Sequence, residues 1–162
     1  MPVVEAKTIP QDSAKSQTPR IDERLMKPGK YEVTEQHTFE IKLYMIQRNN
    51  RWIVLDGPTK NAEEHSIVFR MWNYDEMIEL KKMATSYDPQ KRIHMIDNDV
   101  LNRLKVQRLI VSWTLDRENP RLKLLHVQGI LSDESWKVFT KLQPNIITYI
   151  FDEMNKVYEF GG

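Results

Sequence analysis

Histidines are the first residues to examine for chemistry, because an imidazole can bind a metal or move a proton near neutral pH. The chain has four, which are widely separated, at His37, His65, His94 and His126. None has a second histidine, or an acid pair, at the spacing that places metal ligands on one face of a helix. We therefore predict no metal centre and expect surface or hydrogen-bonded histidines.

Neighbouring carboxylates are the second group that could do chemistry, as a general acid with a general base. Such catalysis needs two carboxyl groups held across a cleft with separated pKa values. The segment Asp97-Asn98-Asp99 lacks the glycine and the downstream glutamate of a calcium loop, and helix capping explains it. We interpret the remaining pairs as helix starts and solvent-facing residues: Glu63-Glu64, Asp75-Glu76, Asp133-Glu134 and Asp152-Glu153.

Other patterns for catalysis or phosphate binding are missing from the sequence. The chain has no cysteine, so it has no thiolate nucleophile, disulfide or thiolate metal site. Its five glycines form no phosphate-binding loop, and no nucleophile elbow or lysine-activated serine motif occurs. We predict a protein that is not an enzyme and uses no cofactor.

The composition indicates a small globular protein without a dominant charge. Of its 162 residues, 40% are hydrophobic and 29% are charged, yet the net charge is only +1. This balance does not attract nucleic acid or an anionic membrane. The sequence has no signal peptide and no apolar stretch of about 18 residues. We expect a soluble protein that stays in the cell or leaves it as part of a particle.

Residues 1–36 differ in composition from the rest of the chain. Four prolines fall among interleaved charges, and apolar residues stand singly. Such a segment buries too little apolar surface to offset its ordering entropy. We expect either a disordered tail or an extended arm that orders on a partner or a neighbouring copy. Ile21, Leu25 and Met26 share one helical face and would anchor it.

Residues 37–162 are expected to form a single α+β domain that begins with strands. Apolar residues alternate with polar ones from Phe39 to Met45, which is typical of a half-buried strand. Asn49 and Asn50 suit a tight turn, because asparagine tolerates positive φ. We therefore predict a hairpin that pairs 38–47 with 51–56.

The segments after this hairpin predict one further strand and a helix. We interpret 61–65 as a polar connector and 66–72 as the third strand of a small antiparallel sheet. Asn73 and Glu76 form a capping-box pattern at the start of a helix that runs to about Tyr87. Its expected buried stripe consists of Tyr74, Met77, Leu80 and Ala84.

A long helix is predicted from Asp97 to about Leu115. Its later part, 109–113, is apolar nearly all round, which is typical of a helix in the core. We expect this to be the central helix of the fold. Residues 116–121 predict a charged turn, and 122–127 either a short strand or an irregular packed segment.

The last third, residues 130–160, predicts two helices hinged at Pro144. Ser132 is the expected N-cap of the first, with Leu131 and Trp136 at the positions of a hydrophobic staple. Pro144 suits the first turn of the second, where its missing N–H costs nothing. The chain is thus expected to pack a sheet of about three strands against a bundle of about four helices. The apolar stripe of the last helix is Ile146, Ile147, Ile150, Phe151, Met154 and Tyr158.

Aromatic residues are the main candidates for contact with a partner. We expect Trp52 and Trp72 on an exposed sheet face. Trp136, Phe151 and Tyr158 are candidates for binding partner helices, with core packing as the alternative. Aromatic residues near basic ones could also stack single-stranded nucleic acid, although the glycine–aromatic signature of an RNA-recognition sheet is missing.

The order of the expected elements is also informative. A β-rich start, FEIKLYMIQ, precedes a tryptophan-ended helix, VLNRLKVQRLIVSWTL, and a charged turn, DRENP. A capped short helix, LSDESWKVFTKL, and a proline-started terminal helix, PNIITYIFDEMNKVYE, complete the chain. This order resembles the tail assembly chaperones and related small morphogenesis proteins of tailed bacteriophages.

The resemblance implies a non-enzymatic adaptor without a cofactor. Such a protein binds the tape-measure protein or tail-tube subunits in the host cytoplasm and prevents aggregation of apolar or helical segments. The arm at 1–36 has no counterpart in the resemblance. That departure leaves a structural protein of the virion as the alternative, in a capsid-decorating, neck or baseplate position, with the arm clasping neighbouring subunits. A single-stranded nucleic-acid-binding module is the third interpretation.

Overall fold

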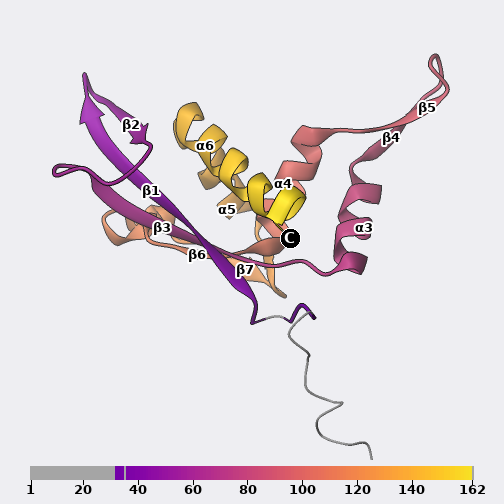
Figure 1. Cartoon of the computed structure of the whole chain (residues 1–162), viewed down its shortest axis with the longest axis horizontal. Helices are drawn as coiled ribbons and strands as arrows, with labels where there is room; N and C mark the ends of the chain where they lie inside the picture. The colour runs from indigo at the N-terminus through magenta and orange to yellow at the C-terminus, as the bar shows by residue number, and fades with distance from the viewer. Residues whose placement is uncertain (1–31, 35, 162) are drawn as a thin grey trace, which may run out of the picture. The chain divides into compact units, whose positions relative to one another are not determined.

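The computed structural model describes residues 32–34 and 36–161 (Figure 1). This part of the chain combines antiparallel sheets with four α-helices, which confirms the predicted α+β class. No helix in it is both long and apolar enough to cross a membrane. The proposed arm anchors Ile21, Leu25 and Met26 lie outside the described residues.

The main sheet contains the predicted hairpin. Strand β1 (Thr38–Arg48) pairs antiparallel with β2 (Arg51–Leu55). The turn residues Asn49 and Asn50 have φ values of 51° and 62°. These values match the left-handed turn that makes a two-residue hairpin connection. The expected hairpin is therefore confirmed, and the two asparagines adopt the positive φ values on which the prediction was based.

Two further strands complete this sheet in the order β2-β1-β3-β6. Strand β3 (Glu63–Arg70) begins inside the segment that was interpreted as a connector. That interpretation was wrong, because the alternation already starts there, with His65, Ile67 and Phe69 all buried. Strand β3 pairs with β1 on one side and with β6 on the other.

Strand β6 (Ile110–Trp113) occupies what was expected to be the end of the central helix. Helix α4 (Asn98–Leu109) stops before it, capped at its start by the Asp97 carboxylate. The β-branched Ile110 and Val111 suit a strand. The free edge of β3 supplies hydrogen-bonding partners, as in the pairing of Val68 with Ser112. A fourth strand thus replaces the predicted apolar helix end.

Helix α3 (Tyr74–Met83) begins with the predicted capping box. Asn73 Oδ1 accepts the Glu76 N–H at 2.8 Å, and the Glu76 carboxylate accepts the Asn73 N–H at 3.2 Å. Leu80 is buried as expected, but Tyr74 is 72% exposed. The two lie about 120° apart around the helix axis, so one face cannot bury both.

Helix α3 ends at Met83, four residues before the predicted end at Tyr87. Ala84 is its C-cap, and the next residues form strand β4 (Thr85–Asp88), which pairs with β5 (Ile93–Ile96). Thr85 is β-branched, which suits a strand, and its hydroxyl donates to the Lys81 carbonyl at 2.6 Å. An unpredicted hairpin therefore separates α3 from α4.

Short elements cover the stretch between β6 and the last helices. The predicted charged turn contains two 3-10 helices, η1 (Leu115–Arg117) and η2 (Pro120–Leu122). Strands β7 (His126–Val127) and β8 (Ile130–Leu131) form a small hairpin. Gln128 and Gly129, both with positive φ, make its turn.

The two C-terminal helices start where the sequence predicts. Helix α5 (Asp133–Thr140) is capped by Ser132, whose hydroxyl accepts the Ser135 N–H at 3.1 Å. Pro144 is the first residue of α6 (Pro144–Asn155), and a π-helical turn, η3 (Lys156–Gly161), follows. Helix α6 lies over β1 and β2. It buries Ile146, Ile150 and Met154, as the predicted stripe requires.

Among the described residues, Lys105 of α4 is a charged side chain in the core and is 1% exposed. Its ammonium donates to Asn155 at 2.8 Å and to Glu159 at 2.7 Å, and it lies 5.2 Å from the Trp72 ring centroid. Burial lowers the pKa of Lys105, whereas the bond to Glu159 acts in the opposite direction. This contact ties α4 to α6 and to the C-terminal turn.

The first prediction concerns this buried pair. Glu159→Gln leaves the Lys105 ammonium without its counter-charge, so we expect the free energy of unfolding to fall by about 3 kcal/mol. Lys105→Met fills the same volume without a charge and should cost far less. Urea unfolding of both variants measures the difference. Glu153→Gln, which breaks only the exposed pair with Lys156, is the control. Equal losses for Glu159→Gln and Lys105→Met would contradict this account.

The second prediction concerns acid. Hydrogen bonds from Arg70 hold the pKa of Glu76 below its ordinary value. Burial alone would raise the pKa of Glu159, but Lys105 and Lys81 outweigh it and lower that pKa too. A carboxyl whose pKa is lower in the folded chain stabilises above its unfolded pKa, and this contribution is lost as the pH falls through the folded value.

We therefore expect the free energy of unfolding to decrease as the pH drops below the ordinary glutamate value of 4.5. Glu76→Gln keeps the capping-box acceptor but cannot titrate. Its stability should depend less steeply on acid pH than that of the wild type in denaturant titrations. A Glu76→Gln profile parallel to the wild-type profile would show that this carboxyl contributes nothing to acid sensitivity.

Candidate functional site

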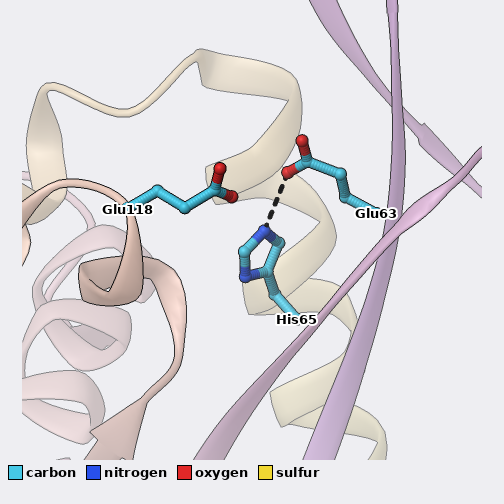
Figure 2. Close-up of side chains that lie close together, drawn as sticks. All are labelled: Glu63, His65 and Glu118. Atoms are coloured by element: carbon cyan, nitrogen blue, oxygen red, sulfur yellow. Dashed lines mark hydrogen bonds and ion pairs between the residues drawn. The ribbon is translucent and has the colours of Figure 1, made fainter.

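Three side chains with metal-ligand chemistry converge at the start of β3 (Figure 2). Glu63 and His65 lie on one face of this strand, because side chains alternate with a period of two. His65 is 9% exposed, while Glu63, at the strand end, is half-buried. Glu118 follows η1 and is exposed. Their nearest ligand atoms all lie within 4.8 Å of one another.

The His65 ring is held at both nitrogens. Its Nε2 lies 3.1 Å from Glu63 Oε1, and its Nδ1 lies 3.2 Å from Thr114 Oγ1. Thr114 is itself fixed to the backbone of Ser66. The Thr114 N–H donates to the Ser66 carbonyl at 3.0 Å, and the Ser66 N–H donates to Thr114 Oγ1 at 2.9 Å. The hydrogen bonds between Thr114 and Ser66 of β3 therefore help to set the orientation of the His65 imidazole.

The Glu118 carboxylate makes no ion pair or hydrogen bond with any residue between 36 and 161. Its position depends on the segment that carries it. The Trp113 indole N–H donates to the Leu122 carbonyl at 2.7 Å and so closes the chain around η1 and η2. Leu115, the first residue of η1, is buried. The loop that carries Glu118 is thus held near His65 by the Trp113–Leu122 hydrogen bond and by the burial of Leu115.

This cluster can bind a cation. Two carboxylates and one imidazole can coordinate a divalent metal, or the carboxylates can hold a protonated His65 between them. Sequence reasoning missed it because the search used helical spacing. The pattern Glu63-x-His65 would have revealed two of the three residues once they were assigned to a strand. Glu118 has no local signal that points to this site.

A second candidate site is an apolar surface on the β4–β5 hairpin. All residues from 89 to 100 are exposed. In Figure 1 the hairpin extends beyond the ends of α3 and α4. We call the following residues, each 39–53% exposed, the hairpin surface: Met83, Tyr87, Ile93, Met95, Ile96 and Val100.

The hairpin is shaped by polar contacts that leave its apolar side chains outside. The Asp88 carboxylate accepts the N–H groups of Gln90 and Lys91, at 2.9 and 3.2 Å. At the base, the Asp97 N–H donates to the Ala84 carbonyl at 2.8 Å.

The register places Ile93 and Met95 on one face of the hairpin, and Tyr87 and Ile96 on the other. Two strands alone are marginally stable in water. Exposed apolar side chains on such an element are typical of a protein-binding site.

A cavity of about 810 Å³ lies where β3 meets α3 and where α4 meets β6. Arg70 and Arg108 contribute to its lining. Arg70 forms a two-point ion pair with Glu76, at 2.9 and 2.7 Å, and Arg108 lies 3.8 Å from Glu79. Because both guanidinium groups face carboxylates, the cavity is a poor anion site.

Two of the aromatic contact candidates are core residues. Trp72 is 4% exposed, so the expectation of an exposed sheet face is wrong for it. Its ring packs against Tyr158 at 4.9 Å and beneath the Lys105 ammonium. Tyr158 is also buried, and its hydroxyl donates to the Arg70 carbonyl at 2.6 Å. For Tyr158 the alternative of core packing therefore applies.

The other aromatic candidates are half-buried. Trp52 packs against the core, and its backbone bonds to Gln143, the N-cap of α6, and to Asn145 of α6. Trp136 stacks on Phe139 at 5.2 Å, and Phe151 lies 5.9 Å from the same ring. Partner contact by these three residues stays a prediction.

Comparison with known proteins adds no relative to this picture. No protein-family model, curated protein or solved structure matches the chain. The candidate sites therefore rest on the residues and their geometry.

The third prediction tests the anchor of the Glu118 loop. Trp113→Phe keeps an aromatic ring but removes the donor to Leu122, so we expect a loss of about 1–2 kcal/mol in the free energy of unfolding. Amide hydrogen exchange across 115–122 should accelerate. Trp52→Phe is the matched control, since the Trp52 indole donates to no described residue. Unchanged exchange at 115–122 in Trp113→Phe would show that other contacts hold the loop.

Proposed function

We propose that this chain is a non-enzymatic assembly protein that acts through protein–protein contacts, and that the hairpin surface binds its partner. The observation that carries the proposal is the set of exposed apolar side chains on the β4–β5 hairpin, an element without a core of its own, and on the adjoining ends of α3 and α4. Their burial by a partner would be favourable, at about 25 cal/mol for each Å² of apolar surface.

The chemistry of the hairpin surface describes the partner. Met83 and Met95 are flexible and polarisable, which suits an adaptable apolar contact. Lys91 and Arg92 are exposed at the hairpin tip. A partner segment with an apolar face and acidic residues beside it complements both features.

We further propose that the partner is a phage tail protein, either the tape-measure protein or a tube subunit, bound in the host cytoplasm. The support is the order of elements quoted above. Two of its parts, the capped α5 and the proline-started α6, are present as expected. A third is different, because Trp113 ends strand β6 rather than a helix. The resemblance therefore rests on fewer matching secondary-structure elements than the sequence suggested.

The competing interpretations are outcomes of the same tests. A virion component would use the arm at 1–36, of which residues 1–31 and 35 lie outside the described residues, to clasp its neighbours. A nucleic-acid module would need exposed aromatic residues near basic ones, and the burial of Trp72 removes one of them. Mass spectrometry of purified particles separates a virion component, present in stoichiometric copies, from an assembly chaperone, which is absent.

The fourth prediction tests the hairpin surface. We expect Ile93→Ser/Met95→Ser to bind the tape-measure or tube protein of the same phage at least about tenfold more weakly in pull-down and calorimetry. The fold should persist, since both side chains are exposed. Val127→Ser is the matched control, because Val127 is an exposed apolar residue of a different hairpin, β7–β8.

Two results would overturn the proposal. One is a wild-type chain that binds neither tail protein. The other is unchanged binding by the hairpin variant, which would move the contact elsewhere on the chain.

A further inference from the structure

We infer that Glu63, His65 and Glu118 form a binding site for a divalent transition-metal cation such as Zn²⁺. The inference stands on the geometry of this cluster and needs neither a partner protein nor the hairpin surface. It assigns a ligand to three residues that the proposed function leaves unused.

The donor set decides the class of metal. Two carboxylates alone would suit Mg²⁺ or Ca²⁺, which prefer oxygen ligands. The imidazole nitrogen of His65 shifts the preference to first-row transition metals. Three protein ligands with one position left for water is a common arrangement around zinc. The cluster therefore fits Zn²⁺ better than a hard cation.

The ligand spacing is close to what a single ion needs. Two donors at about 2.0–2.1 Å from a tetrahedral zinc ion are separated by about 3.3 Å. Glu63 Oε1 and His65 Nε2 lie 3.1 Å apart, so this edge of the site already exists. All three donors lie within 4.8 Å of one another. A shift of up to about 1.5 Å in the exposed Glu118 side chain would close the site around one ion.

The surroundings of His65 are those of a metal ligand. Histidines that bind metals usually donate their second ring N–H to a fixed acceptor, which orients the ring. Thr114 Oγ1 lies 3.2 Å from Nδ1 and is held by Ser66. In the tautomer that donates from Nδ1, the Nε2 lone pair faces two carboxylates. A cation between these three acceptors removes their mutual repulsion.

Charge and access favour the same conclusion. Glu63 and Glu118 converge on one point, and no described residue forms an ion pair with Glu118. Figure 2 shows both carboxylates directed toward the Nε2 end of the ring. His65 is nine-tenths buried, whereas Glu118 is exposed, so an ion can enter from that side. A bound ion would join β3 to the loop after η1 and would stabilise the folded chain.

The experiment uses the full chain after treatment with a chelator. Calorimetric titration with Zn²⁺ should show one saturable site, and Zn²⁺ should raise the melting temperature. In ¹⁵N spectra of the imidazoles, Zn²⁺ should shift Nε2 of His65 and leave His37, His94 and His126 unchanged. Mg²⁺ in excess should not compete, because it binds imidazole poorly.

Three variants complete the fifth prediction. Glu118→Gln and Glu63→Gln should each weaken Zn²⁺ binding by at least about tenfold, as expected for loss of a ligand. Glu64→Gln should change it less than about twofold. Glu64 is the matched control, because it lies between the two β3 ligands, faces the other side of the sheet and pairs with Lys42 at 2.9 Å.

The inference is overturned by either of two results. The first is the absence of saturable binding at up to about 1 mM Zn²⁺. The second is Zn²⁺ binding that leaves the His65 Nε2 signal unchanged and persists in both ligand variants. The imidazole signal keeps the test decisive even if a variant fails to fold.

Discussion

Hydrogen bonding of β3 on both of its edges is the constraint on which the rest of this structure depends. Strand β1 takes one edge and β6 takes the other, so no residue of β3 can shift register without moving both neighbours. Its inward face supplies Ile67 and Phe69 to the core. The same alternation places Glu63 and His65 on that face as well, at the start of β3. The core and the candidate metal site therefore share one cause.

The buried Lys105 shows how the helices are tied to that sheet. An ammonium in an apolar core needs acceptors, and it finds them only if α4 meets the end of the chain at Asn155 and Glu159. Tyr158, between those two acceptors, bonds to the last residue of β3. The polar contacts thus specify one arrangement of α4, α6 and β3, where apolar packing alone would tolerate several.

The two candidate sites lie on different parts of this framework. The Glu63–His65–Glu118 cluster is at the start of β3, and the hairpin surface lies beyond α3, which follows the end of β3. Over its eight residues β3 spans roughly 25 Å. A metal at one site would therefore touch no partner residue at the other. It would act on binding only through the stability of the sheet between them.

Several elements of this fold can be predicted from local patterns of residue types. The β1–β2 hairpin follows from alternation and two asparagines, and the starts of α3, α5 and α6 follow from Asn73, Ser132 and Pro144. Only the tertiary structure decided that residues 110–113 form a strand, because their partner is the edge of β3. It also decided that Trp72 is buried and that Glu118 meets His65. These outcomes depend on contacts between residues far apart in the chain, and no local pattern of residue types encodes such contacts.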